Sequence, residues 1–269
     1  MINTIKVSII IATYNSGKTL ERTINSIINQ TYQFKELIII DGGSKDSTVE
    51  LLKKYKSNID YYISELDNGI YDAWNKGVQV AKGEWICFIG SDDYFLDQDC
   101  LGKLVEYTNL VNNESTKLIY CDLHLFKNNI FSEKIGKPWN VTKKNLKITM
   151  SMPHVGLLHH CTLFQEFGLF NIKYKIAGDY DFMLRVTKKY NAYYIENFAV
   201  IGMSIGGVST QKDMYFNLIK EEFLARRDNR IFPYNSLFFK RVAYWYLRKI
   251  LLIFGKSFFL KIKSVFNAS

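Results

Sequence analysis

The first hundred residues combine short, continuous apolar runs with segments in which apolar residues recur every three or four positions. Continuous runs of this length are typical of strands that are buried on both faces of a parallel sheet. Four such strands are predicted, over residues 5–12, 37–40, 59–63 and 85–89. Between the first two, Leu20, Ile24 and Ile27 fall on one face of a helix. The alternation predicts β-α-β units and an α/β fold with a mostly parallel central sheet flanked by helices.

Two more helices are predicted in this half of the chain. Ser47 and Glu50 have the spacing of a capping box, in which two side chains satisfy the free N–H groups at a helix start. Another helix is predicted over residues 70–81 and ends at Gly83. Each of these helices would connect two of the predicted parallel strands.

The pattern after residue 100 is more mixed. Strands are predicted over 118–126 and 192–195, and helices over 180–189 and 214–227. No internal repeat or low-complexity linker is visible, and acidic residues stop near Pro233. We therefore predict a domain over residues 1–230, with halves 1–100 and 101–230, and a C-terminal helical extension over 231–269.

Length and composition are those of an ordinary globular protein. The chain has 269 residues, of which 48% are hydrophobic and 23% charged. Its four cysteines form no C-x-x-C pair, so we expect free, mostly buried thiols and no zinc site. The first residues lack the basic start and long apolar stretch of a signal peptide. No charge-free apolar run approaches the roughly 20 residues of a membrane span, so we expect a cytoplasmic protein.

The net charge of +9 is concentrated in the predicted extension. Residues 231–269 contain seven Lys or Arg and no Asp or Glu. On a helical wheel, five of these basic residues share a sector of about 100°, among aromatic and aliphatic neighbours. They are Arg241, Arg248, Lys249, Lys256 and Lys263. A basic amphipathic helix suits the surface of an anionic bilayer, which predicts peripheral contact with the inner face of the cell membrane. A helix packed on the domain with a solvated rim is the open alternative.

Carboxylates directly follow two of the predicted strands. Asp41 comes after the second strand, and Asp92 and Asp93 come after the fourth. Ligands of open α/β sheets bind at the carboxyl ends of the strands, so these side chains should lie along one edge. Adjacent carboxylates beside a buried strand are costly unless they face solvent or bind a cation, and Mn²⁺ or Mg²⁺ suits such hard oxygen ligands. A solvated loop or a helix cap is the alternative.

Residues 41–48, DGGSKDST, form a glycine-containing turn before a predicted helix. Glycine lets the backbone approach a ligand closely, and the helix start offers free N–H groups. The chain has neither a G-x-G-x-x-G motif nor a Walker lysine, which excludes Rossmann dinucleotide sites and P-loops. A plain turn with an N-cap remains the alternative.

Asp179 and three histidines are the candidate residues of the second half. Asp179 opens a predicted helix, where an aspartate is either a cap or a general base that reaches an acceptor hydroxyl. His154, His159 and His160 follow Pro153 at a spacing that is poor for a helical metal site. From the residues alone, packed or solvated histidines are the simpler interpretation.

Taken in order, these segments resemble glycosyltransferase family 2, whose members have the GT-A fold. The resemblance spans about residues 5–212. The first β-α unit of the family is similar to VSIIIATYNSGKTLERTINSIINQTY, and its second strand to ELIIIDGGSKDST. Its segment that ends in a metal-binding Asp pair is similar to SELDNGIYDAWNKGVQVAKGEWICFIGSDD. Its acceptor half and a late loop near the donor phosphates are similar to MPHVGLLHH, KYKIAGDYDFMLR and GGVST (206–210).

Two positions depart from the family pattern. Gly90 stands where many members have an acidic residue, which leaves the metal and ribose contacts to Asp92 and Asp93. Gly178 stands where a glutamate commonly precedes the catalytic aspartate, so a supporting carboxylate is missing beside Asp179. We interpret both as variation within the family.

The resemblance implies an inverting, metal-dependent glycosyltransferase that moves a sugar from a nucleotide-diphosphate sugar to an acceptor hydroxyl. Asp179 would be the base, Asp93 would hold Mn²⁺ or Mg²⁺, and Asp92 would contact the metal or the ribose. The other site residues would be Thr13, Tyr14 and Asp41 at the base, Glu65 and Asp67 at the sugar, and His154 at the acceptor or the phosphates. The expected donor is a UDP-sugar, and the expected acceptor is a saccharide or lipid-linked saccharide in cell-surface polysaccharide biosynthesis.

Three other functions fit parts of the pattern. A nucleotidyltransferase would need a Gly-rich, basic loop to hold a triphosphate, and residues 12–18 do not form one. A catalytically inactive nucleotide-sugar-binding module of the same fold is the main alternative, although the four retained aspartates favour an enzyme. No nucleic-acid partner is expected, because the basic residues lie in an apolar tail and not on a motif of known docking geometry.

Overall fold

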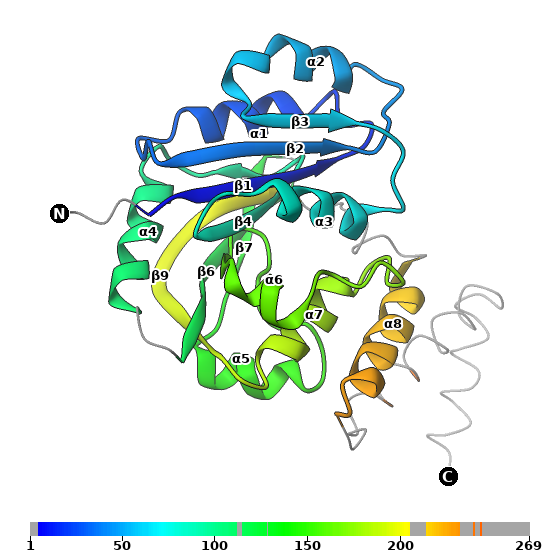
Figure 1. Cartoon of the computed structure of the whole chain (residues 1–269). Helices are drawn as coiled ribbons and strands as arrows, with labels where there is room; N and C mark the ends of the chain where they lie inside the picture. The colour runs from blue at the N-terminus through cyan, green and yellow to red at the C-terminus, as the bar shows by residue number, and fades with distance from the viewer. Residues whose placement is uncertain are drawn as a thin grey trace, which may run out of the picture.

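One sheet with helices on both faces forms the core of the molecule (Figure 1). The computed structural model describes residues 5–111, 115–127, 129–204 and 214–231, together with Phe239 and Ala243. The GGVST motif and nearly all of the predicted extension lie outside the described residues.

The sheet has the strand order β3-β2-β1-β4-β8-β6-β9-β5, and β7 pairs with β6. The strands are β1 Val7–Thr13, β2 Lys35–Asp41, β3 Tyr61–Ser64, β4 Trp85–Gly90, β5 Tyr94–Phe95, β6 Thr116–Lys127, β7 Ile130–Ile135, β8 Leu158–His160 and β9 Asn191–Ser204. The α-helices are α1 Leu20–Ile28, α2 Thr48–Lys54, α3 Ile70–Val80, α4 Cys100–Leu110, α5 Trp139–Leu146, α6 Thr162–Phe167, α7 Gly178–Val186 and α8 Tyr215–Asp228. A short 3-10 helix, η1 Lys56–Asn58, precedes β3.

Strands β3, β2, β1 and β4 are parallel, which confirms the predicted β-α-β arrangement. Alternate residues of β1 contribute to two separate cores. Ile9 and Ile11 pack in the core that contains residues of α1, α2 and α4. Ile10 packs in the core that contains residues of α3, α6 and α7. Because both faces are covered, the strand is an almost continuous apolar run and does not alternate.

The register of these strands positions the candidate site. Thr13 of β1 pairs with Asp41 of β2, and Asp41 pairs with Ser64 of β3. On the other side of β1, Ala12 pairs with Gly90 of β4. The four strands therefore end nearly level, and the loops that follow them lie along one edge of the sheet.

The second half of the sheet is mixed. β8 is antiparallel to β4 and to β6, whereas β9 is parallel to β6. β9 is much longer than the predicted strand over 192–195. Asn197 has a positive φ of 54°, and the register between β6 and β9 shifts beside it. This irregularity interrupts the apolar pattern, which is why only the first part of the strand was predictable.

The predicted capping box at Ser47 is wrong. Ser47 is the N-cap of α2 but makes no side-chain hydrogen bond there. The Asp46 carboxylate instead accepts hydrogen bonds from the backbone N–H (3.0 Å) and the hydroxyl (2.5 Å) of Thr48. It also accepts one from Gly17 N (2.9 Å), so the same side chain joins the start of α2 to the loop after β1.

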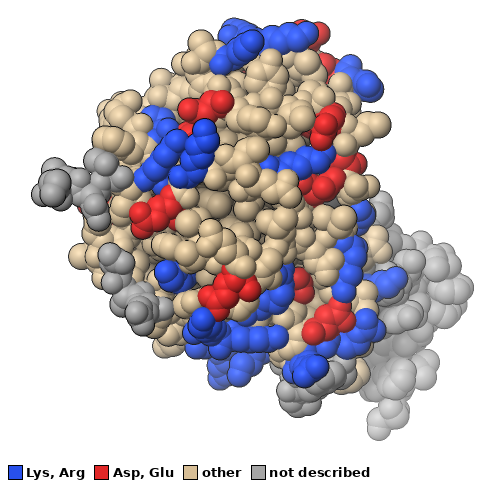
Figure 2. All heavy atoms as spheres, viewed as in Figure 1, with Lys and Arg blue, Asp and Glu red and all other residues tan. Residues whose placement is uncertain are grey.

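The cysteines agree with the sequence analysis. All four cysteines are free, and Cys87, Cys100 and Cys121 are buried. On the face shown in Figure 2, Lys and Arg side chains are interspersed with Asp and Glu side chains. Within the described part of the chain, no helix is both long and apolar enough to cross a membrane.

Candidate active site

Hydrogen bonds join the loops that follow β1 and β2. Asn15 N donates to Ser44 Oγ (2.7 Å), and Lys45 N donates to Asn15 Oδ1 (2.9 Å). Ser16 N donates to Thr48 Oγ1 (2.8 Å). Asn15 suits this turn because asparagine tolerates positive φ, here 50°, better than most residues. The two loops thus form one continuous platform at the carboxyl edge of the sheet.

Asp41 is fully buried at the end of β2, and its carboxylate accepts three hydrogen bonds. Ser44 donates through its backbone N–H (3.0 Å) and through its hydroxyl. Ser64 donates through its hydroxyl (2.5 Å). These bonds hold the loop after β2 in place. The contact of Asp41 with a nucleotide base stays a prediction, and it would use the remaining acceptor capacity of the carboxylate.

Thr13 and Tyr14 are adjacent but differ in exposure. The Thr13 hydroxyl is buried and has no hydrogen-bond partner among the described residues. A buried hydroxyl without a partner is destabilising, so a polar group of a ligand would be favourable there. The Tyr14 side chain is 63% exposed. Both arrangements are compatible with the predicted contact to the donor.

Asp93 is buried at the end of β4, beside the half-buried Asp92. Asp93 Oδ2 accepts a hydrogen bond from Gly90 N (3.1 Å). Its Oδ1 has no partner within the described ranges of the chain. Burial, and then the charge of Asp92, raise the pKa of Asp93 to about 7. A cation at this position would supply the missing partner and would favour the charged carboxylate.

Helix α1 fixes the backbone of the aspartate pair. Arg22 Nη2 donates to Asp92 O (2.8 Å), and its guanidinium lies 4.1 Å from the centroid of the Tyr94 ring. The hydroxyl of Thr23 donates to Asp93 O (2.7 Å). Both bonds go to backbone carbonyl oxygens, so they do not occupy the carboxylate oxygens of Asp92 and Asp93. The sequence analysis did not single out Arg22 or Thr23, because nothing in the helical pattern indicates which loop they contact.

The aspartate pair fits a divalent cation that is shared with a ligand. Among the residues that the structure describes, no group of three or more His, Cys, Asp or Glu could form a complete metal site. Mn²⁺ and Mg²⁺ often bind through one or two carboxylates and complete their coordination with water and substrate phosphates. Asp92 and the free oxygen of Asp93 provide such a partial site. At Gly90, a Cβ would lie 2.5 Å from Asp93 Oδ2, so glycine here makes room for that carboxylate.

Glu65 and Asp67, the predicted sugar-pocket residues, lie in different surroundings. Glu65 forms an ion pair with Lys76 of α3 (2.8 Å). Asp67 Oδ1 accepts a hydrogen bond from Gly69 N (2.8 Å). Its Oδ2 lies 2.8 Å from the position that a Cβ on Gly42 would occupy. The absence of a side chain at Gly42 therefore lets the Asp67 carboxylate lie against the end of β2.

His154 is buried in an aromatic cluster. Its ring stacks on Trp74 and on Phe88, with centroid distances of 5.0 and 5.5 Å. Burial, and then the neighbouring His159, hold the pKa of His154 well below its usual range, so the ring is neutral. Neither ring nitrogen has a hydrogen-bond partner in the part of the chain described. This environment is that of a packed histidine, and contact with the acceptor or the phosphates stays a prediction.

Asp179 lies half-buried in the first turn of α7. Burial raises its pKa to about 6. Tyr180 N (2.8 Å) and the Tyr71 hydroxyl (3.1 Å) both donate to Oδ1 and oppose this shift. A carboxylate with this pKa is ionised at neutral pH and is more basic than an ordinary aspartate. The environment is therefore compatible with the predicted general base.

Two residues around Asp179 were missed in the sequence analysis. Tyr71 reaches the carboxylate from α3. Glu221 of α8 accepts hydrogen bonds of 2.8–3.0 Å from the backbone N–H groups of residues 175–177. It thus places a carboxylate at the start of α7, where Gly178 supplies none. The helical spacing of Tyr71 predicts only a core-facing side chain, and no local pattern connects α8 with α7.

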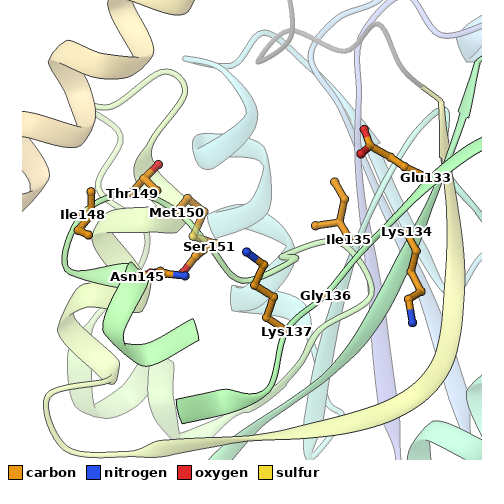
Figure 3. A pocket seen from close by; sticks show the side chains of 10 residues that line it. All are labelled: Glu133, Lys134, Ile135, Gly136, Lys137, Asn145, Ile148, Thr149, Met150 and Ser151. Carbon is orange, nitrogen blue, oxygen red and sulfur yellow. The ribbon is translucent and has the colours of Figure 1, made fainter. Parts of the chain in front are cut away.

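A cavity of about 490 Å³ lies in the second half of the domain (Figure 3). The end of β7 and the segment after α5 form its walls, and the lining residues are Glu133, Lys134, Ile135, Gly136, Lys137, Asn145, Ile148, Thr149, Met150 and Ser151. Thr149 Oγ1 donates to Glu222 Oε1 of α8 (2.5 Å), next to Glu221. None of the predicted site residues lines this cavity.

The chain belongs to glycosyltransferase family 2. A family model described as "Glycosyl transferase family 2" matches residues 8–152. A "PGL/p-HBAD biosynthesis glycosyltransferase" of Mycobacterium bovis (strain BCG / Pasteur 1173P2) is 30% identical over 181 residues. The alignment covers 66% of this chain and 68% of that protein. The family predicted from the sequence is therefore confirmed.

Two solved glycosyltransferase structures share the fold. S. aureus TarS 1-349 in complex with UDP-GlcNAc has a TM-score of 0.62 and 16% identity, with 82% of this chain and 66% of that chain covered. The mannosyltransferase PcManGT from Pyrobaculum calidifontis, in complex with GDP-Man and Mn²⁺, has a TM-score of 0.63 and 16% identity. That match covers 90% of this chain and 70% of the mannosyltransferase. The predicted GT-A fold is confirmed, and the chain spans about two thirds of the length of these proteins.

Proposed function

We propose that the chain is an inverting, metal-dependent glycosyltransferase that moves a sugar from a nucleotide-diphosphate sugar to an acceptor hydroxyl. The observation that carries this mechanism is the environment of Asp179. Its carboxylate lies at the start of a helix, is partly exposed, and has a pKa raised to about 6 by burial. This carboxylate is a much weaker base than an alkoxide, so it can remove the proton of an alcohol only while the alcohol oxygen attacks the anomeric carbon. Proton transfer and attack in the same step are what a single displacement requires.

In the proposed reaction, an Asp179 oxygen accepts the proton of the acceptor hydroxyl. The acceptor oxygen forms a bond to the anomeric carbon as the bond from that carbon to the diphosphate oxygen breaks. The nucleotide diphosphate leaves with the electron pair of the broken bond, and the configuration of the anomeric carbon is inverted.

Asp93, with Asp92 beside it, is the proposed metal-binding group. Its buried Oδ1 has no partner among the residues described, which supports a role in holding Mn²⁺ or Mg²⁺. Such an ion supplies positive charge to the departing diphosphate. We assign Asp92 to the metal or the ribose, Thr13, Tyr14 and Asp41 to the nucleotide base, and Glu65 and Asp67 to the sugar. His154 is assigned to the acceptor or the phosphates.

The substrates are inferred at the level of chemical class. TarS is described with UDP-GlcNAc and PcManGT with GDP-Man, which supports a nucleotide-sugar donor, with a UDP-sugar as the first choice. The mycobacterial relative is named for PGL/p-HBAD biosynthesis, which supports a saccharide or lipid-linked acceptor in a surface glycoconjugate. The cavity beside β7 combines Lys134 and Lys137 with Ile135 and Met150, and we assign it to the acceptor side.

The first experiment is a binding and hydrolysis screen of the purified chain with UDP-, GDP- and dTDP-sugars, with and without Mn²⁺. We expect one nucleotide to bind only with the metal, and we expect Asp93→Ala to abolish this binding. Asp97→Ala is the matched control, because the Asp97 side chain is 53% exposed and pairs with Lys103 of α4. If the folded protein binds no nucleotide under any condition, the proposed donor site is wrong.

The main alternative is a catalytically inactive nucleotide-sugar-binding module of the same fold. It predicts metal-dependent binding without transfer or hydrolysis for any donor. Asp179→Asn separates the two: the enzyme loses transfer and keeps donor binding, whereas an inactive module shows no difference in turnover between wild type and variant.

A further inference from the structure

The proposed base is in contact with the other half of the domain. Tyr71 belongs to α3 in the first half, whereas Asp179 opens α7 in the second half. Tyr71 Oη lies 3.1 Å from Asp179 Oδ1 and 2.6 Å from Ile176 O. Tyr71 is only 4% exposed, so water cannot readily replace these bonds. Its hydroxyl therefore links the donor half to the start of α7.

Gly178 makes this close approach possible. A Cβ at residue 178 would lie 2.8 Å from two carbons of the Tyr71 ring, so any side chain there would displace the ring. On its other sides the ring packs against Trp74 and Phe170, with centroid distances of 5.5 and 5.8 Å. These contacts define one position for the ring and direct its hydroxyl toward Asp179.

We infer that Tyr71 is a positioning residue for Asp179, because its one hydroxyl proton is shared between Ile176 O and the Asp179 carboxylate and so ties the carboxylate to the start of α7. This inference rests on the proposed function, in which Asp179 is the base. Burial and the neighbouring Asp179 raise the pKa of Tyr71 well above its usual range, so the phenol keeps its proton. It can therefore act as a donor throughout the working pH range.

Other charged groups near Asp179 come from α8 and from the segment before α7. Glu222 of α8 raises the pKa of Asp179, and Glu221 binds the backbone of residues 175–177. Lys175 carries the nearest basic side chain in that segment, and its Nζ donates to Asn68 O (2.6 Å). A Tyr71 variant leaves all of these groups in place, so a change in the titration of Asp179 can be attributed to the lost hydroxyl.

The test is Tyr71→Phe, which removes only the hydroxyl. Because a donor that the charged carboxylate shares with Ile176 O is lost, we expect the pKa of Asp179 to rise by up to about one pH unit. Carbon-13 NMR titration of the aspartate carboxyl groups measures this without any substrate, and Asp179→Asn identifies the resonance. In transfer assays, the pH at which kcat/KM declines on the acidic side should rise by the same amount. Activity above pH 8 should stay close to that of the wild type.

Tyr120→Phe is the matched control. The buried Tyr120 hydroxyl donates to Lys137 O (2.8 Å), so this variant loses a similar hydrogen bond far from Asp179 in the sequence and should leave the titration unchanged. The inference would be overturned if the pKa of Asp179 in Tyr71→Phe were unchanged or lower than in the wild type. An equal loss of activity at every pH would also overturn it. Near-normal transfer by folded Asp179→Asn would instead overturn the proposed function, so the two failures are distinguishable.

Discussion

At the scale of single residues, two carboxylates have raised pKa values for different reasons. Asp93 is buried, and the charge of Asp92 adds to the effect. Asp179 is raised by burial, while hydrogen bonds from Tyr71 and Tyr180 oppose the shift. Carboxylates in such different environments suit different tasks, and here we assign metal binding to one and proton transfer to the other.

We expect the charged Asp93 carboxylate to lower the free energy of unfolding of the metal-free protein. Its pKa rises from an ordinary 3.8 to about 7 on folding, so the folded state binds more protons than the unfolded state between these values. Its contribution to stability therefore falls as pH rises from about 4 to 7 and stays low above that range. We expect Asp93→Asn to raise the free energy of unfolding at pH 8 by about 1–3 kcal/mol, with a smaller gain at pH 5.

Urea denaturation in the presence of a chelator measures this effect. Asp97→Asn should change stability little at either pH, because the side chain is half exposed and the amide oxygen can keep the hydrogen bond from Asp99 N. Equal stability of Asp93→Asn and wild type at pH 8 would show that the charged Asp93 carboxylate is not destabilising.

At the scale of elements, α7 is held between two other helices. Tyr71 of α3 contacts Asp179, and Glu221 of α8 accepts hydrogen bonds from the backbone that precedes α7. Negative charge at a helix start is favourable, because the N–H groups there have no partners within the helix. The two contacts thus fix the helix start that carries the proposed base.

Glu221→Ala should therefore loosen the start of α7. Several backbone N–H groups would lose a charged acceptor, and we expect a loss of about 1–3 kcal/mol in the free energy of unfolding. Amide exchange at residues 175–177 should become faster, and kcat should fall more than KM rises. Asn217→Ala, at an exposed position on the same helix, is the control. Unchanged amide exchange in Glu221→Ala would contradict this role.

At the scale of the whole molecule, the sheet joins the two halves of the domain, to which we assign different tasks. The four parallel strands of the first half end at the aspartates, and the mixed strands of the second half support the cavity beside β7. α3 and α7 contribute to the same apolar core, so the proposed donor and acceptor sides are packed together. The residues that we assign to the two substrates can then keep a fixed relative position.

The basic tail over residues 231–269 carries a prediction for the whole chain. We expect the full-length protein to float with vesicles that contain anionic lipid, and a chain that ends at Phe232 to float less. Replacement of Arg241, Arg248, Lys249, Lys256 and Lys263 by glutamine should weaken binding, as should about 0.5 M salt, because salt screens surface charge. Equal flotation of the long and short chains would show that the tail does not bind the membrane.

The sequence by itself determined the four parallel strands of the first half, the fold class and the position of the aspartates along the edge. A strand covered on both faces is apolar at most positions, and Asp41, Asp92 and Asp93 mark the points where β2 and β4 end. These are local properties, because the apolar pattern reports burial residue by residue. Motif order then identified the family, which the match over residues 8–152 confirms.

Only the tertiary structure decided which side chains surround those aspartates. Tyr71 and Asp179 are 108 positions apart, and Glu221 is 44 positions from Ala177. Periodicity shows that a helix face is buried but not which element covers it, so neither contact was predictable. The same holds for the register shift between β6 and β9 and for the cap of α2, where Asp46 takes the place of Ser47. Which side chains contact one another depends on how the helices and strands pack, and packing brings together residues that are distant in the sequence.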